Sequence, residues 1–182
     1  MKQYISPLSI ISLNSTNNTI DRKDIVVAKK RLLAEFELQG ASTIKVNDKE
    51  LNKNDVLLVF EELNNIETIE FHKVVFDQKK LLYFLEKNQL SSNVLNDYII
   101  ENSVKIEDAF YISDETKTED FVDWLMPYFT FSFKHAVVNY YRNNNWKAFK
   151  ILSHCSLYFD YAYEQEAWEP VLAILKNEVD KL

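Results

Sequence analysis

The sequence contains a single glycine, Gly40, among its 182 residues. Loops that cradle phosphate groups need glycine, because only a residue without a side chain lets the backbone approach a ligand closely. The chain therefore has no Walker loop, no dinucleotide-binding fingerprint and no nucleophile elbow. Catalytic and cofactor sites that depend on such loops are excluded, and no cofactor is predicted.

Hydrophobic periodicity predicts a mainly α-helical fold. The clearest helix covers residues 21–39, where Ile25, Ala28, Leu32 and Phe36 recur at helical spacing and Gly40 follows in the place of a left-handed C-cap. Further helical segments are predicted at residues 53–63, 66–77 and 81–88, from residues 91–92 onward, from residue 119 to Pro127, from there to residue 141, at 146–154, and at the C-terminal end. The fold class is a compact multi-helix bundle, in one or two lobes.

Three places depart from simple helical periodicity. Residues 44–51 predict one short β-hairpin, because Asn47 and Asp48 both tolerate the positive φ of a two-residue turn. Pro127 disfavours helical geometry at Met126, so a break or kink is predicted there. Residues 104–112 fit a short strand and a short helix equally well.

Charge and aromatic residues divide the chain near its middle. Residues 1–90 hold equal numbers of basic and acidic side chains, whereas residues 91–182 carry the whole net charge of −7 and 18 of the 25 aromatic residues. This pattern predicts a neutral helical lobe with the hairpin at residues 1–90 and an acidic, aromatic-rich helical lobe at residues 91–182. The boundary is expected in the loop at 88–93 or at 113–118, with both lobes packed as one compact unit.

Charge and cysteine content limit the partners and the compartment. A net charge of −7 argues against general binding to nucleic acid or to anionic membranes, and the densest basic run, Lys29-Lys30-Arg31, spreads around a helix. One cysteine, Cys155, allows no intramolecular disulfide. The N-terminal segment lacks the regions of a signal peptide, and no apolar stretch is long enough to cross a membrane. We therefore expect a protein of the bacterial cytoplasm.

The residues that could carry chemistry form no recognisable motif. None of His72, His135 and His154 has a partner at metal-ligand spacing, so no metal site is predicted. Cys155 is expected at the C-terminal end of a helix, where the dipole disfavours a reactive thiolate. An enzyme without a linear motif, using His135, His154 or Cys155, stays open as an alternative. The acidic run from Asp114 to Asp120 lacks the spacing of a calcium loop and fits a solvated helix start.

The aromatic stretch between Trp124 and Tyr141 is the main candidate for a functional surface. It holds more aromatic side chains than one helix face can bury, and aromatic residues are enriched at the centres of protein interfaces. Trp124, Tyr128, Phe131 and Tyr141 are predicted to bind a protein partner, and a large aromatic core is the alternative. The predicted function is a non-catalytic protein–protein interaction or adaptor module, and a homo-oligomer is left open.

Residues 6–36 resemble the first two helices of a J-domain. SPLSIISL resembles the short first helix, and IDRKDIVVAKKRLLAEFE resembles the second, with Ala28 and Lys29-Lys30-Arg31 where that family carries alanine and basic residues. The resemblance implies a J-like chaperone partner as a second alternative. The His-Pro-Asp signature that stimulates a chaperone ATPase is absent, and Gly40-Ala41-Ser42 with the predicted hairpin stand in its place.

Overall fold

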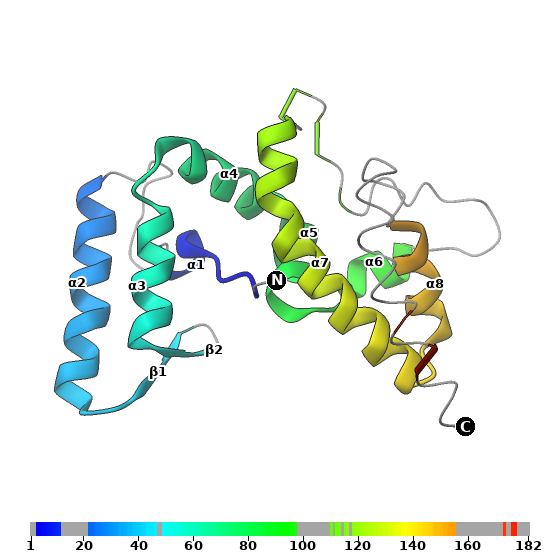
Figure 1. Cartoon of the computed structure of the whole chain (residues 1–182), viewed down its shortest axis with the longest axis horizontal. Helices are drawn as coiled ribbons and strands as arrows, with labels where there is room; N and C mark the ends of the chain where they lie inside the picture. Colours follow the sequence, from blue (N-terminus) through cyan, green and yellow to red (C-terminus); the bar gives the residue numbers. More distant parts are fainter. Residues whose placement is uncertain are drawn as a thin grey trace. The chain divides into compact units, whose positions relative to one another are not determined.

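A computed structural model describes residues 3–11, 22–46, 49–97, 110, 112–113, 115–116 and 118–155, together with residues 173, 176 and 177. For residues 49, 97 and 153–155 only the backbone is described. Within these residues the fold is mainly helical, with helices α1–α8 and one antiparallel two-stranded hairpin (Figure 1). The predicted fold class is therefore confirmed.

The chain divides into two units. The N-terminal unit is Ile5–Asp77, and the C-terminal unit is Gln78–Leu182 together with Met1–Tyr4. The boundary therefore lies at Asp77 and not near residue 90, where the change in charge had placed it. The physical reason is packing, because α5 (Lys79–Lys87) packs against α7 (Glu119–Arg142) of the C-terminal unit.

The N-terminal unit contains a pair of antiparallel helices with the hairpin at one end (Figure 1). Its elements are α1 (Pro7–Ile11), α2 (Arg22–Gln39), β1 (Thr43–Val46), β2 (Lys49–Asn52), α3 (Lys53–Glu62) and α4 (Ile66–Asp77). Gly40 follows α2 at φ 58°, the left-handed conformation expected of a C-cap glycine. The buried core of this unit is mainly aliphatic and takes Phe36 from α2 and Phe60 from α3.

The hairpin and the start of α3 form one continuous local structure. Val46 pairs with Lys49, so the two-residue connection lies at the predicted place, although residues 47 and 48 are outside the described part. Asn52 then caps α3, because its side-chain carbonyl accepts from the Asp55 backbone N–H at 3.0 Å. The Asp55 carboxylate accepts from the Asn52 backbone N–H at 2.9 Å, which completes a capping box.

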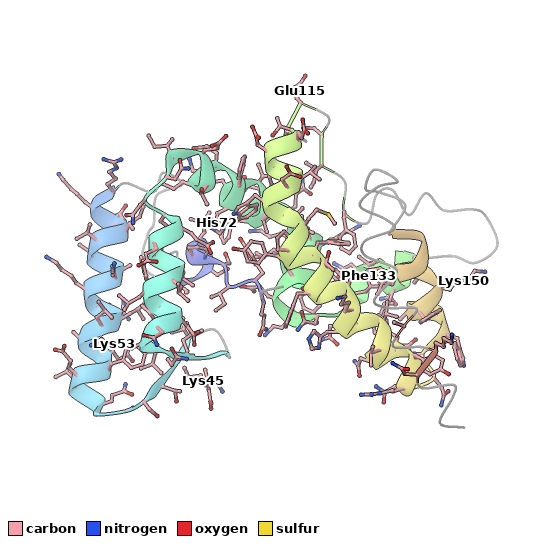
Figure 2. All side chains as sticks on the ribbon, viewed as in Figure 1. Lys45, Lys53, His72, Glu115, Phe133 and Lys150 are labelled. Carbon is pink, nitrogen blue, oxygen red and sulfur yellow. The ribbon has the colours of Figure 1, made fainter. Side chains whose placement is uncertain are left out.

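The C-terminal unit is built around α7. Its other described helices are α5, α6 (Ser92–Asp97) and α8 (Trp146–Cys155), and both α5 and α8 pack on α7. The core is aromatic: Phe84 of α5 lies 5.3 Å from Phe129 of α7, measured between ring centroids, and 5.0 Å from Phe110. Phe133, labelled on α7 in Figure 2, continues this core by stacking on Phe129.

Two buried hydrogen bonds join α7 to α5 and to the residues that follow α5. The Ser132 hydroxyl donates to the Leu85 carbonyl at 3.2 Å. The Leu90 backbone N–H donates to the Tyr140 hydroxyl oxygen at 2.6 Å. These bonds satisfy buried polar groups that would otherwise destabilise the aromatic core.

Of the break or kink predicted at Pro127, the break is wrong, because α7 continues as one α-helix from Glu119 to Arg142. Proline removes one backbone donor, so the carbonyl four residues earlier, at Asp123, loses its helical partner. Both Pro127 and Asp123 are exposed, and water can therefore solvate that carbonyl. The backbone hydrogen bonds on the buried side of α7 do not involve Pro127, and the packing of this side against the core keeps the helix continuous.

Two predictions fall on residues that the structure hardly describes. The ambiguous segment at 104–112 lies outside the described residues except for Phe110 and Ile112, which are buried. The predicted C-terminal helix lies outside them except for residues 173, 176 and 177, which are helical.

Candidate recognition surface on helix α7

Helix α7 begins as the sequence predicts. Thr118 is the N-cap, and its hydroxyl accepts from the Phe121 backbone N–H at 3.2 Å. Glu119 and Asp120 follow in the first turn and are exposed, so their charges face solvent near the positive end of the helix dipole. Glu115 projects from the turn before α7 (Figure 2). These acids therefore form a solvated helix start, and no group of three metal-ligating side chains exists among the described residues.

One side of α7 is partly exposed along most of its length. Trp124, Phe131, His135, Val138 and Arg142 follow one another at steps of seven, four, three and four residues, which places them on a common helix face. All five are partly or fully exposed, whereas the opposite side of α7 is buried. We call these five residues the α7 stripe. Phe131 and His135 pack together within it, with ring centroids 4.4 Å apart.

The four residues predicted to bind a partner are not equivalent in the structure. Phe131 lies on the α7 stripe and Tyr141 beside it, both partly exposed. Trp124 is also partly exposed and lies 6.3 Å from the ring of Tyr4, between centroids. Tyr128 is only 7% exposed and lies 5.3 Å from Tyr4. Tyr128 is therefore part of the aromatic core, which was the alternative for this stretch, and we remove it from the candidate surface.

An exposed aromatic cluster lies where α7 ends and α8 begins. Trp146, the first residue of α8, is 55% exposed. Its ring lies 5.7 Å from Tyr141 and 6.1 Å from Phe149, between centroids, and meets both edge-on. We call these three residues the aromatic cluster. Trp146 was not among the residues predicted to bind a partner, and its position directly after the Asn143–Asn145 turn was the signal that it could be exposed.

A cavity of about 690 Å³ opens beside the α7 stripe. Its described lining comes from the C-terminal end of α5 and the last turns of α7: Lys87, Asn88, Lys134, His135, Val138, Asn139 and Arg142. Three of these residues are cations, and none is an acid. We call this cavity the cationic pocket. Its positive charge contrasts with the acidic composition of residues 91–182.

Asn88 has an unusual position in this pocket. It is the C-cap of α5 and adopts φ 56°, the left-handed conformation that asparagine tolerates better than most residues. Its backbone N–H donates to the Phe84 carbonyl at 2.8 Å. Its side-chain oxygen Oδ1 is buried and has no hydrogen-bond partner among the described residues. A buried acceptor without a donor is uncommon in proteins and requires an explanation.

The electrostatic environment of the pocket affects Lys134. Partial burial lowers the pKa of Lys134 from its ordinary value, because desolvation disfavours the charged ammonium. Lys134 and Arg142 each also interact with at least one other group. Asn139 is also engaged, since its side-chain oxygen accepts from the Asn143 amide at 2.7 Å.

Of the residues of the catalytic alternative, His135 is the one whose side chain the structure describes. His135 lines the cationic pocket. His154 and Cys155 are the last two residues of α8, so they end this helix as predicted. The structure describes only their backbone. His72 belongs to the N-terminal unit and is fully buried beside α3 (Figure 2). Its Nε2 lies 3.2 Å from a Glu62 carboxylate oxygen without hydrogen-bond geometry, which indicates a structural contact.

No known protein family, characterised protein or solved structure matches this chain. The comparisons therefore leave the resemblance of residues 6–36 to a J-domain as a prediction. In the part of the chain that the structure describes, no helix is both long and apolar enough to cross a membrane.

Proposed function

We propose that this chain is a non-catalytic protein-binding module of the cytoplasm, and that it binds its partner through the α7 stripe and the aromatic cluster. The observation that carries the proposal is the exposure of Trp146 within a group of three contacting aromatic rings. A tryptophan that is half exposed leaves a large apolar surface in water, and such surfaces mark binding sites when they occur in groups.

The composition of this surface suggests the chemistry of the partner. Aromatic residues and arginine are the residue types most enriched at energetic centres of protein interfaces, and the α7 stripe combines both. Cations gather at the same end of α7, at Lys134 and Arg142 of the pocket. A complementary partner segment would carry an apolar side chain for the rings and acidic side chains for the cations.

The test is capture of a partner by the purified full chain and by two variants, Phe131→Ala and Trp146→Ala. Leu38→Ala is the matched control, because Leu38 is an apolar side chain that is 87% exposed but lies on α2 of the N-terminal unit. A captured protein is then purified and its affinity measured with each variant. We expect both aromatic variants to weaken binding about tenfold or more, as truncation of an interface centre does.

The thermal unfolding of each variant is measured in parallel. Phe131 and Trp146 are partly exposed, so their truncation should leave the fold intact. Equal binding by Trp146→Ala and by the unmodified chain would refute this surface. A loss of folding in Phe131→Ala would mean that this ring belongs to the core, as Tyr128 does.

A further inference from the structure

We propose that the aromatic cluster binds a proline-rich segment in the polyproline II conformation, with an acidic side chain among its prolines. This inference rests on the proposed function, because it names the class of partner segment that the same surface takes. Three observations carry it: the hydrogen-bond donors of the cluster, the angles between its rings, and the charge of the chain around it.

The polar groups of the aromatic cluster have no hydrogen-bond partner among the described residues. Trp146 is 55% exposed, and its indole N–H bonds to none of them. The Tyr141 hydroxyl is also without a partner there, and it is not one of the buried polar atoms, so it reaches solvent. The indole N–H can only donate, and the hydroxyl can donate as well. The cluster therefore offers two donors to a ligand.

A polyproline II segment has the complementary acceptors. Proline brings a backbone carbonyl and no N–H group, and the polyproline II helix has no internal hydrogen bonds, so its carbonyls stay open. An α-helical segment uses its carbonyls internally, and an added strand needs the edge of a sheet. The aromatic cluster lies on α7 and α8, where no sheet edge is present. Among the regular backbone conformations, polyproline II therefore matches the donors of the cluster.

The rings of the cluster meet almost at right angles. The plane of Trp146 makes an angle of 88° with that of Tyr141 and 74° with that of Phe149. Perpendicular rings do not cover each other's faces as stacked rings do, so aromatic faces stay open to a ligand. Proline rings pack on such faces, and their fixed φ means that little conformational entropy is lost on binding.

The chain around the cluster is basic, although the second half of the sequence is acidic. Between residues 124 and 155 the sequence has four lysine or arginine residues and no aspartate or glutamate. Lys147 directly follows Trp146 on α8, is exposed, and forms no ion pair with any residue that the structure describes. An acidic side chain in the bound segment would complement this cation, which adds charge complementarity to the match of donors and rings.

The experiment measures the affinity of a proline-rich peptide for the full chain by titration calorimetry. The peptide has blocked ends, one glutamate among its prolines, and about nine residues, which form three turns of polyproline II. A second peptide has the same length and glutamate, with alanine in place of every proline. We expect the alanine peptide to bind at least about tenfold more weakly, because it lacks the proline rings and the preset conformation.

Two conservative variants test the donors. Tyr141→Phe and Trp146→Phe each keep an aromatic ring and remove one donor, and each should weaken binding of the proline-rich peptide about fivefold. Tyr83→Phe is the matched control, because it removes a phenolic hydroxyl from a partly exposed residue of α5 outside the cluster, and it should leave the affinity unchanged. Thermal unfolding of each variant is measured in parallel and should not change.

A charge reversal tests the cation. Lys147→Glu should weaken binding of the glutamate-containing peptide about threefold, as expected for one exposed ion pair. Lys53→Glu is its matched control, because Lys53 is an exposed cation of α3 in the N-terminal unit and should not affect the affinity.

The outcomes separate this inference from the proposed function. Equal affinities for the proline and alanine peptides, or unchanged binding by both donor variants, would overturn the proline assignment. An oligothymidylate that binds more tightly than the peptide, with the same dependence on Trp146 and Lys147, would indicate a site for single-stranded nucleic acid and also overturn it. If a captured protein needs Trp146 but the proline-rich peptide does not bind, the aromatic surface stands and only the class of its partner is wrong.

Discussion

The two units of the molecule are stabilised in different ways. The core of the N-terminal unit is mainly aliphatic, and its hairpin, C-cap glycine and capping box are all formed by residues close together in the sequence. The core of the C-terminal unit is aromatic, and its buried polar contacts join residues 47 and 50 positions apart. Interactions between residues close in the sequence therefore define much of the structure of the N-terminal unit. In the C-terminal unit, contacts between the distant helices α5 and α7 have this role.

The largest expected effect tests the aromatic core of the C-terminal unit. Phe129 is 1% exposed and contacts Phe84, Phe110 and Phe133. Its replacement by alanine leaves a cavity, so Phe129→Ala should lower the free energy of unfolding by about 3–5 kcal/mol. Chemical denaturation measures this change. Phe131→Ala, two positions along the same helix but partly exposed, is the control and should have a clearly smaller effect.

The next effect concerns the long-range hydrogen bond between Leu90 and Tyr140. Tyr140→Phe removes the acceptor and leaves the buried Leu90 N–H without a partner, which should destabilise the protein by about 1–3 kcal/mol. Tyr83→Phe is the control, because the Tyr83 hydroxyl accepts an exposed hydrogen bond from Gln89. Equal stability of the two variants would mean that long-range polar contacts contribute little to the C-terminal unit.

The local signals of the N-terminal unit give a smaller effect. Asn52→Ala removes the side-chain half of the capping box, and thermal unfolding should show a loss of about 1 kcal/mol. Asn54→Ala changes the same residue type two positions later, at an exposed site inside α3, and should be nearly neutral. If Asn52→Ala lowered the free energy of unfolding as much as Tyr140→Phe does, the two units would not differ in the way described above.

The smallest effect is expected at alkaline pH. Burial raises the pKa of Tyr140, and the neighbouring Tyr83 adds to this, although the hydrogen bond from Leu90 acts in the opposite direction. A raised pKa means that the folded state holds the phenolic proton more tightly than the unfolded state does. The stability from this group is therefore complete below the unfolded pKa of about 10 and is lost as the pH rises through the folded value.

Denaturation profiles of the unmodified chain and of Tyr140→Phe across this alkaline range measure the difference. The gap between the two should narrow as the pH rises above about 10. A gap that stays constant would show that Tyr140 does not titrate differently in the folded and unfolded states.

The same contrast explains what the sequence could predict. Gly40 and the hairpin depend on neighbours within a few positions, so local chemistry was sufficient to predict them. The break at Pro127 was predicted wrongly because the packing of α7, which overrides a local preference, cannot be seen in the adjacent residues. Tyr128 was placed at a partner surface because the pattern could not show that Tyr4, far away in the sequence, covers it.

The cationic pocket could not be predicted from neighbouring residues in the sequence. Lys87 and Asn88 end one helix, and Lys134 and Arg142 belong to another, more than forty positions later in the sequence. Only the packing of α5 on α7 brings them to a common cavity. The basic run Lys29-Lys30-Arg31 was noticed because it is contiguous, whereas these cations are scattered in a segment whose net charge is negative.

The scarcity of glycine also affects the chain before it folds. Asn88 and Asn144 adopt the positive φ angles at which glycine is the commonest choice. A side chain at such a position restricts the backbone of the unfolded chain, so less conformational entropy is lost when the turn forms. Because Gly40 is the one glycine in the sequence, the other turns have fewer backbone conformations in the unfolded chain than glycine-containing turns would have.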